Sequence, residues 1–362
     1  MKFSSLLLIE PNLRTPSGHY AEFVRAVGSC MSGGSLEVFA DPEADAMLAG
    51  MSGVSVSSRT PRVGEPLAEW RTIYRCIAEN SPFLLLTADG RHAAAASFSS
   101  RFSGNNPTNA NLFFHRAPTT WRDNLLYPVT EFAREYSRAI TSTEQVADSL
   151  KELGWRRVEY IPYPVLAPQF LPEPISFSHL LMAGAARLNK GLDLVAGLAC
   201  KWSVAERSVP LFVQVSKKHT SRHGNRETLY VDKLLSSGYK GLKSDANAPD
   251  RVTYIERFKG ALVLAPYVRE PFASQVSGVV LDALLHGAPV IATKGTWPAI
   301  QVERFGAGIT IEGRTVESLE AAIDSILCNW DAFSARACKA ARTLAREHDP
   351  IHLVKLLGLN SE

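Results

Sequence analysis

Short apolar segments of strand length alternate with longer amphipathic segments along the whole chain. In the first half the apolar segments are SLLLIE, LEVFA, GVSVSS, PFLLLTAD, NLFFHR, AITST and VEYIPYP, separated by stretches such as 67–80 and 145–153. Strands this apolar need helices on both faces of their sheet, which favours βαβ units and a parallel sheet. A second series, SHLLMAGA, VPLFVQVS, GALVLAPY and PVIAT, follows in the other half. The sequence therefore predicts an α/β protein made of two doubly wound domains.

A proline-rich segment separates the two series. Five prolines occur among the thirteen residues 162–174, and neither a helix nor a central strand tolerates them. We expect a first domain at 1–165, a linker at 166–175, a second domain at 176–345 and a C-terminal tail at 346–362. Each domain is then large enough to bury its own core. Ligands of such sheets bind beyond the carboxyl ends of the strands, so we expect the chemistry in a cleft between two facing domains.

Charge and cysteine usage restrict the class of protein. Residues 1–174 carry 16 Lys+Arg against 18 Asp+Glu, and the remainder carries 23 against 18. This small positive excess in the second half suits a small anionic ligand and is too low for a nucleic-acid binder. The five cysteines form no CxxC pair, and the apolar run Leu6 to Ile9 is too short for a signal peptide or a membrane span. We therefore expect a cytoplasmic protein without disulfides.

The segment GAARLNKGLDL follows a predicted strand and opens a predicted helix. Arg187 and Lys190 place two cations beside a helix N-terminus, where Gly191 leaves backbone N–H groups accessible to an anion. This pattern predicts a diphosphate site. The alternative interpretation is a solvated basic turn at the start of a surface helix.

The segment SGVVLDALLHGAPVIAT has the pattern of a helix from Gly278 to Leu285, a glycine stop and a buried strand. Ser277 and Gly278 can cap the helix and offer N–H groups to a phosphate. Asp282 lies one turn further and can accept hydrogen bonds from a ribose diol. The alternative interpretation is that Ser277 only caps the helix and that Asp282 is an exposed helix residue.

These two segments resemble the GT-B glycosyltransferases, and among them the retaining enzymes of glycosyltransferase family 4. The matching residues are Arg187, Lys190, Gly191, Asp282, Gly287, Pro289 and Val290. Ser274 stands where the family has the first of two acids, and Glu270 is the nearest upstream carboxylate. The resemblance implies two Rossmann-like domains facing each other across a cleft, with Asp282 on the ribose and Glu270 as the replacement for the first acid in catalysis.

The first half resembles the same group more loosely. The loop NLRTPSGHY matches the group's glycine loop near the sugar phosphate, with Gly18 giving the close approach and His19 beside it. The resemblance assigns catalytic roles to His115, in LFFHRAPT, and to Asp89. His92 is a weaker candidate for a sugar contact, as is His19. A tight turn without a ligand and solvated strand-end histidines are the alternative interpretations.

The resemblance implies transfer of a sugar from a UDP- or GDP-type donor to a glycan, lipid-linked or small-molecule acceptor, as in polysaccharide or glycoconjugate biosynthesis. It implies that the anomeric configuration is retained, that no metal or other cofactor is required, and that the protein can attach peripherally to the inner face of the membrane. His219 and His223 lack a visible third metal ligand, and no Asp-x-Asp motif occurs. A nucleotide-sugar epimerase of the same fold and a degenerate, non-catalytic scaffold are the alternative functions.

Overall fold

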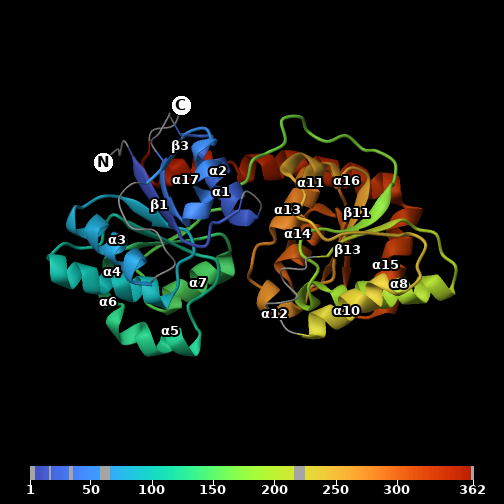
Figure 1. Cartoon of the computed structure of the whole chain (residues 1–362), viewed down its shortest axis with the longest axis horizontal. Coiled ribbons are helices and arrows are strands. Elements are labelled where there is room, and N and C mark those ends of the chain that lie inside the picture. The colour runs from blue at the N-terminus through green and yellow to red at the C-terminus, as the bar shows by residue number, and fades with distance from the viewer. Residues whose placement is uncertain (1–4, 16–17, 32–35, 58–65, 216–224, 360–362) are drawn as a thin grey trace. The chain divides into compact units, whose positions relative to one another are not determined.

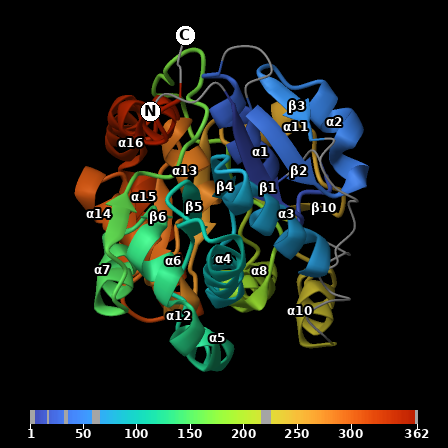
Figure 2. The ribbon, with the colours of Figure 1, turned by 90° about the vertical axis from the view of Figure 1, so that its left-hand side faces the viewer.

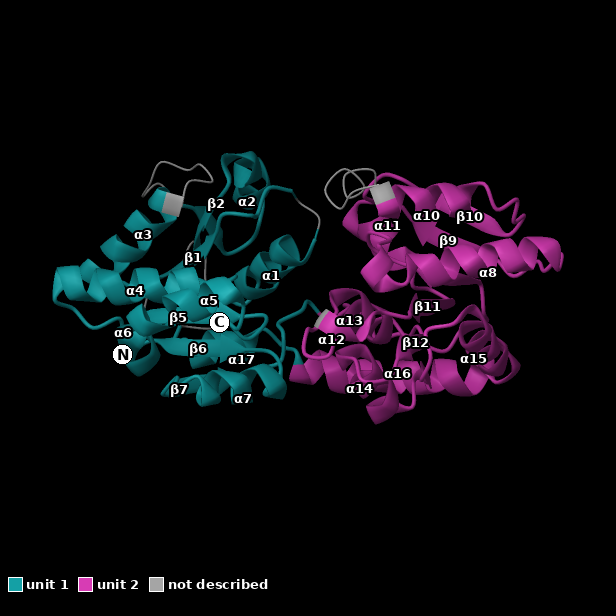
Figure 3. Ribbon diagram, turned by 90° about the horizontal axis from the view of Figure 1, so that it is seen from below, with its two compact units in different colours: residues 1–166, 348–362 teal, residues 167–347 magenta. Residues whose placement is uncertain are grey.

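The chain is divided into two α/β units, which Figure 3 distinguishes by colour. The computed structural model describes residues 5–15, 18–31, 36–57, 66–215 and 225–359. Unit 1 comprises Met1–Leu166 and His348–Glu362, and unit 2 comprises Ala167–Glu347. Each unit contains one parallel sheet with helices packed against it, as the alternating apolar pattern predicts (Figure 1).

Unit 1 is built on a seven-stranded parallel sheet in the order β3-β2-β1-β4-β5-β6-β7. Its strands are β1 Leu6–Glu10, β2 Leu36–Ala40, β3 Val54–Val56, β4 Phe83–Leu85, β5 Ala110–Phe114, β6 Arg138–Thr141 and β7 Arg157–Tyr160. The central strands β1, β4 and β5 are buried along their whole length, which explains why they are apolar at consecutive positions. The strand order reverses between β1 and β4, and this switch point is where such sheets bind ligands.

The helices of unit 1 connect successive strands, except for α17, which comes from the C-terminal end of the chain. They are α1 His19–Gly28, α2 Asp45–Ala49, α3 Pro66–Ala78, α4 Gly90–Ser103, α5 Trp121–Leu126, α6 Glu131–Tyr136, α7 Glu144–Glu152 and α17 Ile351–Leu356, with short 3-10 turns η1 Pro42–Ala44 and η2 Tyr127–Val129. Polar side chains begin several of them: the Asp89 carboxylate accepts from Arg91 N at the start of α4, and Thr143 accepts from Val146 N at the start of α7.

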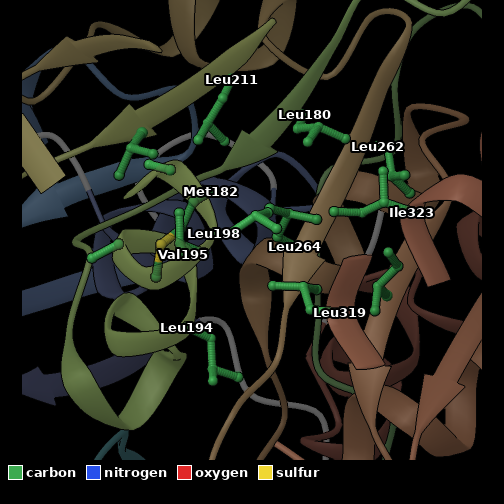
Figure 4. Packing of buried hydrophobic residues seen from close by; sticks show 14 of the residues in the cluster. Leu180, Met182, Leu194, Val195, Leu198, Leu211, Leu262, Leu264, Leu319 and Ile323 are labelled. Carbon is green, nitrogen blue, oxygen red and sulfur yellow. The ribbon is translucent and has the colours of Figure 1, made fainter. Parts of the chain in front are cut away.

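Unit 2 repeats this plan with a six-stranded parallel sheet in the order β10-β9-β8-β11-β12-β13. Its strands are β8 His179–Met182, β9 Leu211–Gln214, β10 Leu242–Asp245, β11 Ala261–Ala265, β12 Val290–Thr293 and β13 Gly308–Ile311. Figure 4 shows how side chains of the sheet, such as Leu180 and Leu264, pack against Val195 and Leu198 of one helix and Leu319 of another. The switch point of this sheet lies between β8 and β11.

The helices of unit 2 carry its two predicted binding segments. They are η3 Leu188–Lys190, α8 Leu192–Val204, α10 Asn225–Leu235, α11 Arg251–Glu256, α12 Arg269–Phe272, α13 Gly278–Leu285, α14 Trp297–Phe305, α15 Val316–Cys328 and α16 Trp330–Glu347. The bounds of α13 coincide with the predicted ones. Helices α15 and α16 are separate because the backbone at Asn329 is not helical.

After α16 the chain returns to unit 1. His348 is buried, its Nδ1–H donates to the carbonyl oxygen of Tyr163 (2.8 Å), and its own carbonyl accepts from Val165 N (3.1 Å). Arg138 of β6 donates to the carbonyl of Leu356 at the end of α17 (2.7 Å). The segment expected as a C-terminal tail therefore contains a helix that is part of the first unit.

Among the described residues, no helix has both the length and the apolar composition needed to cross a bilayer. They contain no group of three or more His, Cys, Asp or Glu side chains placed to hold a metal ion. His219 and His223 lie outside the described residues.

Candidate functional site

The switch point of the second sheet brings together the two segments that the sequence analysis selected. The segment after β8 contains η3, with Arg187 at its N-cap and Lys190 as its last residue. The segment after β11 leads to α13, whose N-cap is Ser277. Because β8 and β11 are neighbouring parallel strands, both segments leave the same edge of the sheet.

Arg187 and Lys190 are two neighbouring cations, and the carboxylate of Glu227 accepts a hydrogen bond from the backbone N–H of Leu188, which lies between them in the sequence (3.3 Å). Burial, and next to it the positive charge of Arg187, lower the pKa of Lys190 to about 8. Arg187 Nε is buried and has no hydrogen-bond partner. Within the described part of the chain, no carboxylate forms an ion pair with either side chain. An anion bound beside the two cations would stabilise their charged forms.

Tyr267 connects the cations to the start of α13. Lys190 Nζ lies 5.8 Å from the centre of the Tyr267 ring, and the Tyr267 hydroxyl lies 3.4 Å from Ser277 Oγ. Burial raises the pKa of Tyr267 to about 12, so this hydroxyl is a neutral hydrogen-bond donor. Ser277 Oγ accepts from Val280 N (3.4 Å), as predicted for a cap. The N–H groups of Gly278 and the next residue have no intrahelical acceptor and are available to an anion.

Two glycines allow this close approach. A Cβ atom on Gly184 would lie 3.2 Å from a methyl carbon of Val279 and 3.7 Å from Lys190 Nζ. Gly191 adopts a φ of 92° between η3 and α8, and a Cβ atom there would lie only 2.5 Å from the ring of Pro266. Both positions therefore need glycine for the backbone to hold Lys190 against the N-terminus of α13.

Asp282 lies on α13, one turn beyond Ser277, and is half-buried. Its Oδ2 accepts a hydrogen bond from the hydroxyl of Tyr254 on α11 (2.9 Å). Burial raises the pKa of Asp282 to about 6, although the Tyr254 bond and the charge of Arg251 act in the opposite direction. The Asp282 carboxylate is therefore partly withdrawn from water. Within the described residues only its Oδ2 atom has a hydrogen-bond partner.

Glu270 lies in the short helix α12, which follows β11. Its backbone has φ −86° and ψ 123°, so the chain is kinked at this residue and not helical. The side chain is exposed. The carboxylate that the resemblance selects in place of the first acid is therefore accessible to a ligand from solvent.

In unit 1 the predicted residues Gly18, His19 and His115 gather at the ends of β1 and β5. Gly18 is the N-cap of α1 with a φ of 105°, and the rings of His19 and His115 lie 6.3 Å apart. The Tyr163 hydroxyl donates to the carbonyl of His19 (3.2 Å). Burial, and then the nearby His19, lower the pKa of His115 to about 3, so its ring is neutral near pH 7. His115 Nε2 is buried without a hydrogen-bond partner among the described residues, which is unusual for a buried polar atom.

Asp89 and His92 form the cap of α4. Asp89 accepts from the backbone N–H groups of Arg91 and His92, while His92 Nδ1 lies 2.8 Å from Asp89 Oδ1 and Nε2 lies 2.9 Å from Glu69 Oε1. Burial opposes a charged imidazole, but the hydrogen bonds to Asp89 and Glu69 outweigh it and raise the pKa of His92 to about 9. The pKa of Asp89 is lowered by the same contacts and by Arg91. Both side chains are used by the fold, so we do not include them in the proposed site.

Tyr254 and Tyr267 were not predicted as site residues. Tyr267 lies two residues beyond the end of β11, at the end of the predicted strand segment GALVLAPY, and nothing in that apolar pattern marks its hydroxyl as functional. Tyr254 lies on α11, in a stretch without an apolar strand pattern, and reaches Asp282 only through tertiary packing. No pattern in the sequence indicates that contact.

The whole chain is structurally similar to solved glycosyltransferases. HepE from Anabaena in complex with UDP superposes with a TM-score of 0.69 at 14% sequence identity, covering 98% of both chains. A glycosyltransferase from Rickettsia africae superposes with a TM-score of 0.69 at 11% identity, and sucrose-phosphate synthase from Thermosynechococcus elongatus with 0.66 at 14%, each covering 98% of both chains. No protein-family model and no curated protein sequence matches this chain.

These similarities extend over both units and confirm the predicted GT-B architecture with two Rossmann-like domains. At 10–14% identity they establish the fold and leave the reaction to be argued from the residues of the site.

Gly278→Ala tests the anion site directly. A Cβ atom at Gly278 meets nothing within 4 Å and the residue has no positive φ, so the melting temperature should not fall. If a phosphate contacts the N-terminus of α13, the added methyl group should weaken UDP or GDP binding roughly tenfold, about the value of one charge-assisted hydrogen bond, in isothermal titration calorimetry. Gly313→Ala, at a glycine where a Cβ atom would meet only a methyl carbon of Thr315 at 3.9 Å, is the control. Equal affinities for both variants would place the anion elsewhere.

Proposed function

We propose that the protein is a metal-independent glycosyltransferase that takes its sugar from a nucleoside-diphosphate donor bound in unit 2. The observation that carries this proposal is the pair of uncompensated cations, Arg187 and Lys190, beside the N-terminus of α13. Similar proteins with this fold are known in complex with UDP and with UDP-glucose. We therefore expect a UDP-type donor, with GDP-type donors as the alternative.

The chemistry of transfer explains why the cations matter. Negative charge grows on the nucleoside diphosphate as the bond to the sugar breaks, and preorganised positive groups stabilise that charge most in the transition state. Arg187, Lys190 and the first N–H groups of α13 are placed to do this without a metal ion. Tyr267 and Ser277 hold the ends of this arrangement together through their hydroxyl groups.

Asp282 is our candidate for the ribose of the donor. Its oxygen that does not contact Tyr254 can accept a hydrogen bond from a ribose hydroxyl.

In unit 1, the neutral ring of His115 is the candidate for a contact with the transferred sugar or the acceptor, with Gly18 and His19 beside it. We propose that Glu270 approaches the sugar ring and that the configuration at the anomeric carbon is retained, with a glycan, lipid-linked or small-molecule acceptor.

Lys190→Met should weaken binding of UDP or GDP roughly ten- to a hundredfold, because it removes a charge-assisted hydrogen bond. Lys339→Met, at an exposed position of α16, is the matched control and should leave calorimetric affinity unchanged.

Turnover of the preferred nucleotide sugar should survive EDTA, since the positive groups are side chains and backbone. A strict need for divalent metal would contradict metal independence, isomerisation of the donor without acceptor would indicate an epimerase, and binding without turnover on any acceptor would indicate a scaffold.

Donor affinity should depend on pH on both sides of neutrality. Below about pH 6 Asp282 gains a proton and can no longer accept as an anion, and above about pH 8 Lys190 loses its charge. Affinity for UDP-glucose, whose diphosphate does not titrate in this range, should therefore fall at both ends between pH 5 and 9. Asp282→Asn should remove the acidic limb and leave the alkaline one. An acidic limb that persists in Asp282→Asn would show that another group causes it.

His115→Ala should reduce the rate of sugar transfer roughly a hundredfold, the effect of removing one donor or acceptor that acts in the transition state. Affinity for the free nucleoside diphosphate should be unchanged, because His115 lies in unit 1. His92→Ala is the contrasting variant: it breaks the contacts with Asp89 and Glu69 and should lower the melting temperature by several degrees. If His115→Ala lowers the melting temperature in the same way, His115 is structural.

A further inference from the structure

A glutamate lies on the side of helix α10 that faces the core of unit 2. Helix α10 packs beside α8 (Figure 2). Its Leu234 is buried in the core, and Tyr230 and Val231 pack against the same core. Glu227 completes this set at the spacing of one helical stripe, and it is only 6% exposed. A buried carboxylate in an apolar stripe departs from the pattern that packing alone would select.

The Glu227 carboxylate contacts the turn η3, which carries the two cations of the donor site. Its Oε1 accepts a hydrogen bond from the backbone N–H of Leu188, the first residue of η3 (3.3 Å). Its Oε2 is buried and has no hydrogen-bond partner among the described residues. Glu227 is therefore bound to the backbone between Arg187 and Lys190 and is not paired with either side chain. A carboxylate with one unpaired buried oxygen costs stability, so helix packing does not explain its presence.

Turn η3 needs restraint because its two cations repel each other, and a free turn would let them move apart. The segment after β11 holds one side of the turn, since Val268 N donates to the carbonyl oxygen of Asn189 (2.9 Å). The N–H of Leu188 is at the N-terminal end of η3, where no intrahelical acceptor exists. Glu227 supplies that acceptor from α10. The turn is thus held from two separate elements of unit 2.

We propose that Glu227 is a positioning residue, which holds η3 through the N–H of Leu188 so that Arg187 and Lys190 both remain at the anion site beside α13. The proposal rests on the proposed function, because it takes a nucleoside diphosphate as the anion. A carboxylate suits this task because both of its oxygens only accept hydrogen bonds, and its charge strengthens the bond to an N–H group. The buried stripe of α10 gives it a rigid support.

Direct contact with the diphosphate does not account for Glu227. The carboxylate and the diphosphate are both negatively charged, so they repel at short distance. A residue that favours binding from this position must act through the turn, by keeping the two cations in place.

Calorimetric titration with UDP tests the positioning role. Glu227→Met removes the acceptor, and UDP affinity should fall roughly tenfold, about the value of a hydrogen bond to a charged group. The melting temperature should not fall, because methionine fills the apolar stripe and no buried charge remains. Glu227→Gln keeps an acceptor and should retain affinity within about threefold. Glu317→Met, at an exposed position of α15, changes net charge equally and should have no effect.

Three results of this titration would overturn the proposal. The first is unchanged affinity in Glu227→Met. The second is a loss of affinity accompanied by a lower melting temperature, which would make Glu227 a structural residue. The third is an equal loss in Glu227→Met and Glu227→Gln, because the acceptor for the N–H group would then be irrelevant.

A double-mutant cycle with Lys190→Met separates this inference from the proposed function. If Glu227 positions Lys190, Glu227→Met should weaken UDP binding by about threefold or less in the Lys190→Met background, because residues that act together are not additive. Two losses that simply multiply would overturn the positioning role. If Lys190→Met alone leaves UDP affinity unchanged, the proposed function fails with it. If Lys190→Met weakens binding and Glu227→Met does not, only the positioning role fails.

Discussion

Two positive charges held next to each other without a counter-ion are the constraint on which the functional part of this structure depends. Desolvation and the neighbouring Arg187 lower the pKa of Lys190, which means that the empty protein carries an unfavourable interaction at this point. The fold keeps the two charges together because η3 lies between Gly191, which has a left-handed backbone conformation, and the N-terminus of the neighbouring helix α13. An anion that binds there relieves the repulsion, so part of its affinity comes from a cost already present in the free protein.

The topology of the sheet in unit 2 determines where Arg187 and Lys190 are brought together. A parallel sheet with a switch point brings the segments after two central strands to one edge, here the segments after β8 and β11. Lys190 lies far from Tyr267 and Ser277 in the sequence, and the parallel sheet brings it beside them. Asp282 follows Ser277 on the same helix, so helix geometry sets the spacing between the proposed phosphate and ribose contacts.

The sequence predicted the parts of this structure that depend on burial. Strands such as β1, β4 and β11 are apolar at every position because they are covered on both faces, and their pattern is unambiguous. The edge strand β10, with the sequence LKSD, is largely exposed and has no such pattern, so it was not predicted. The cations and the cap were predicted from local sequence, but the partner of Asp282 was not, because Tyr254 meets it across α11 and α13 through packing alone. His92 was predicted as a candidate sugar contact. In the structure its place near the start of α4 makes it part of the helix cap.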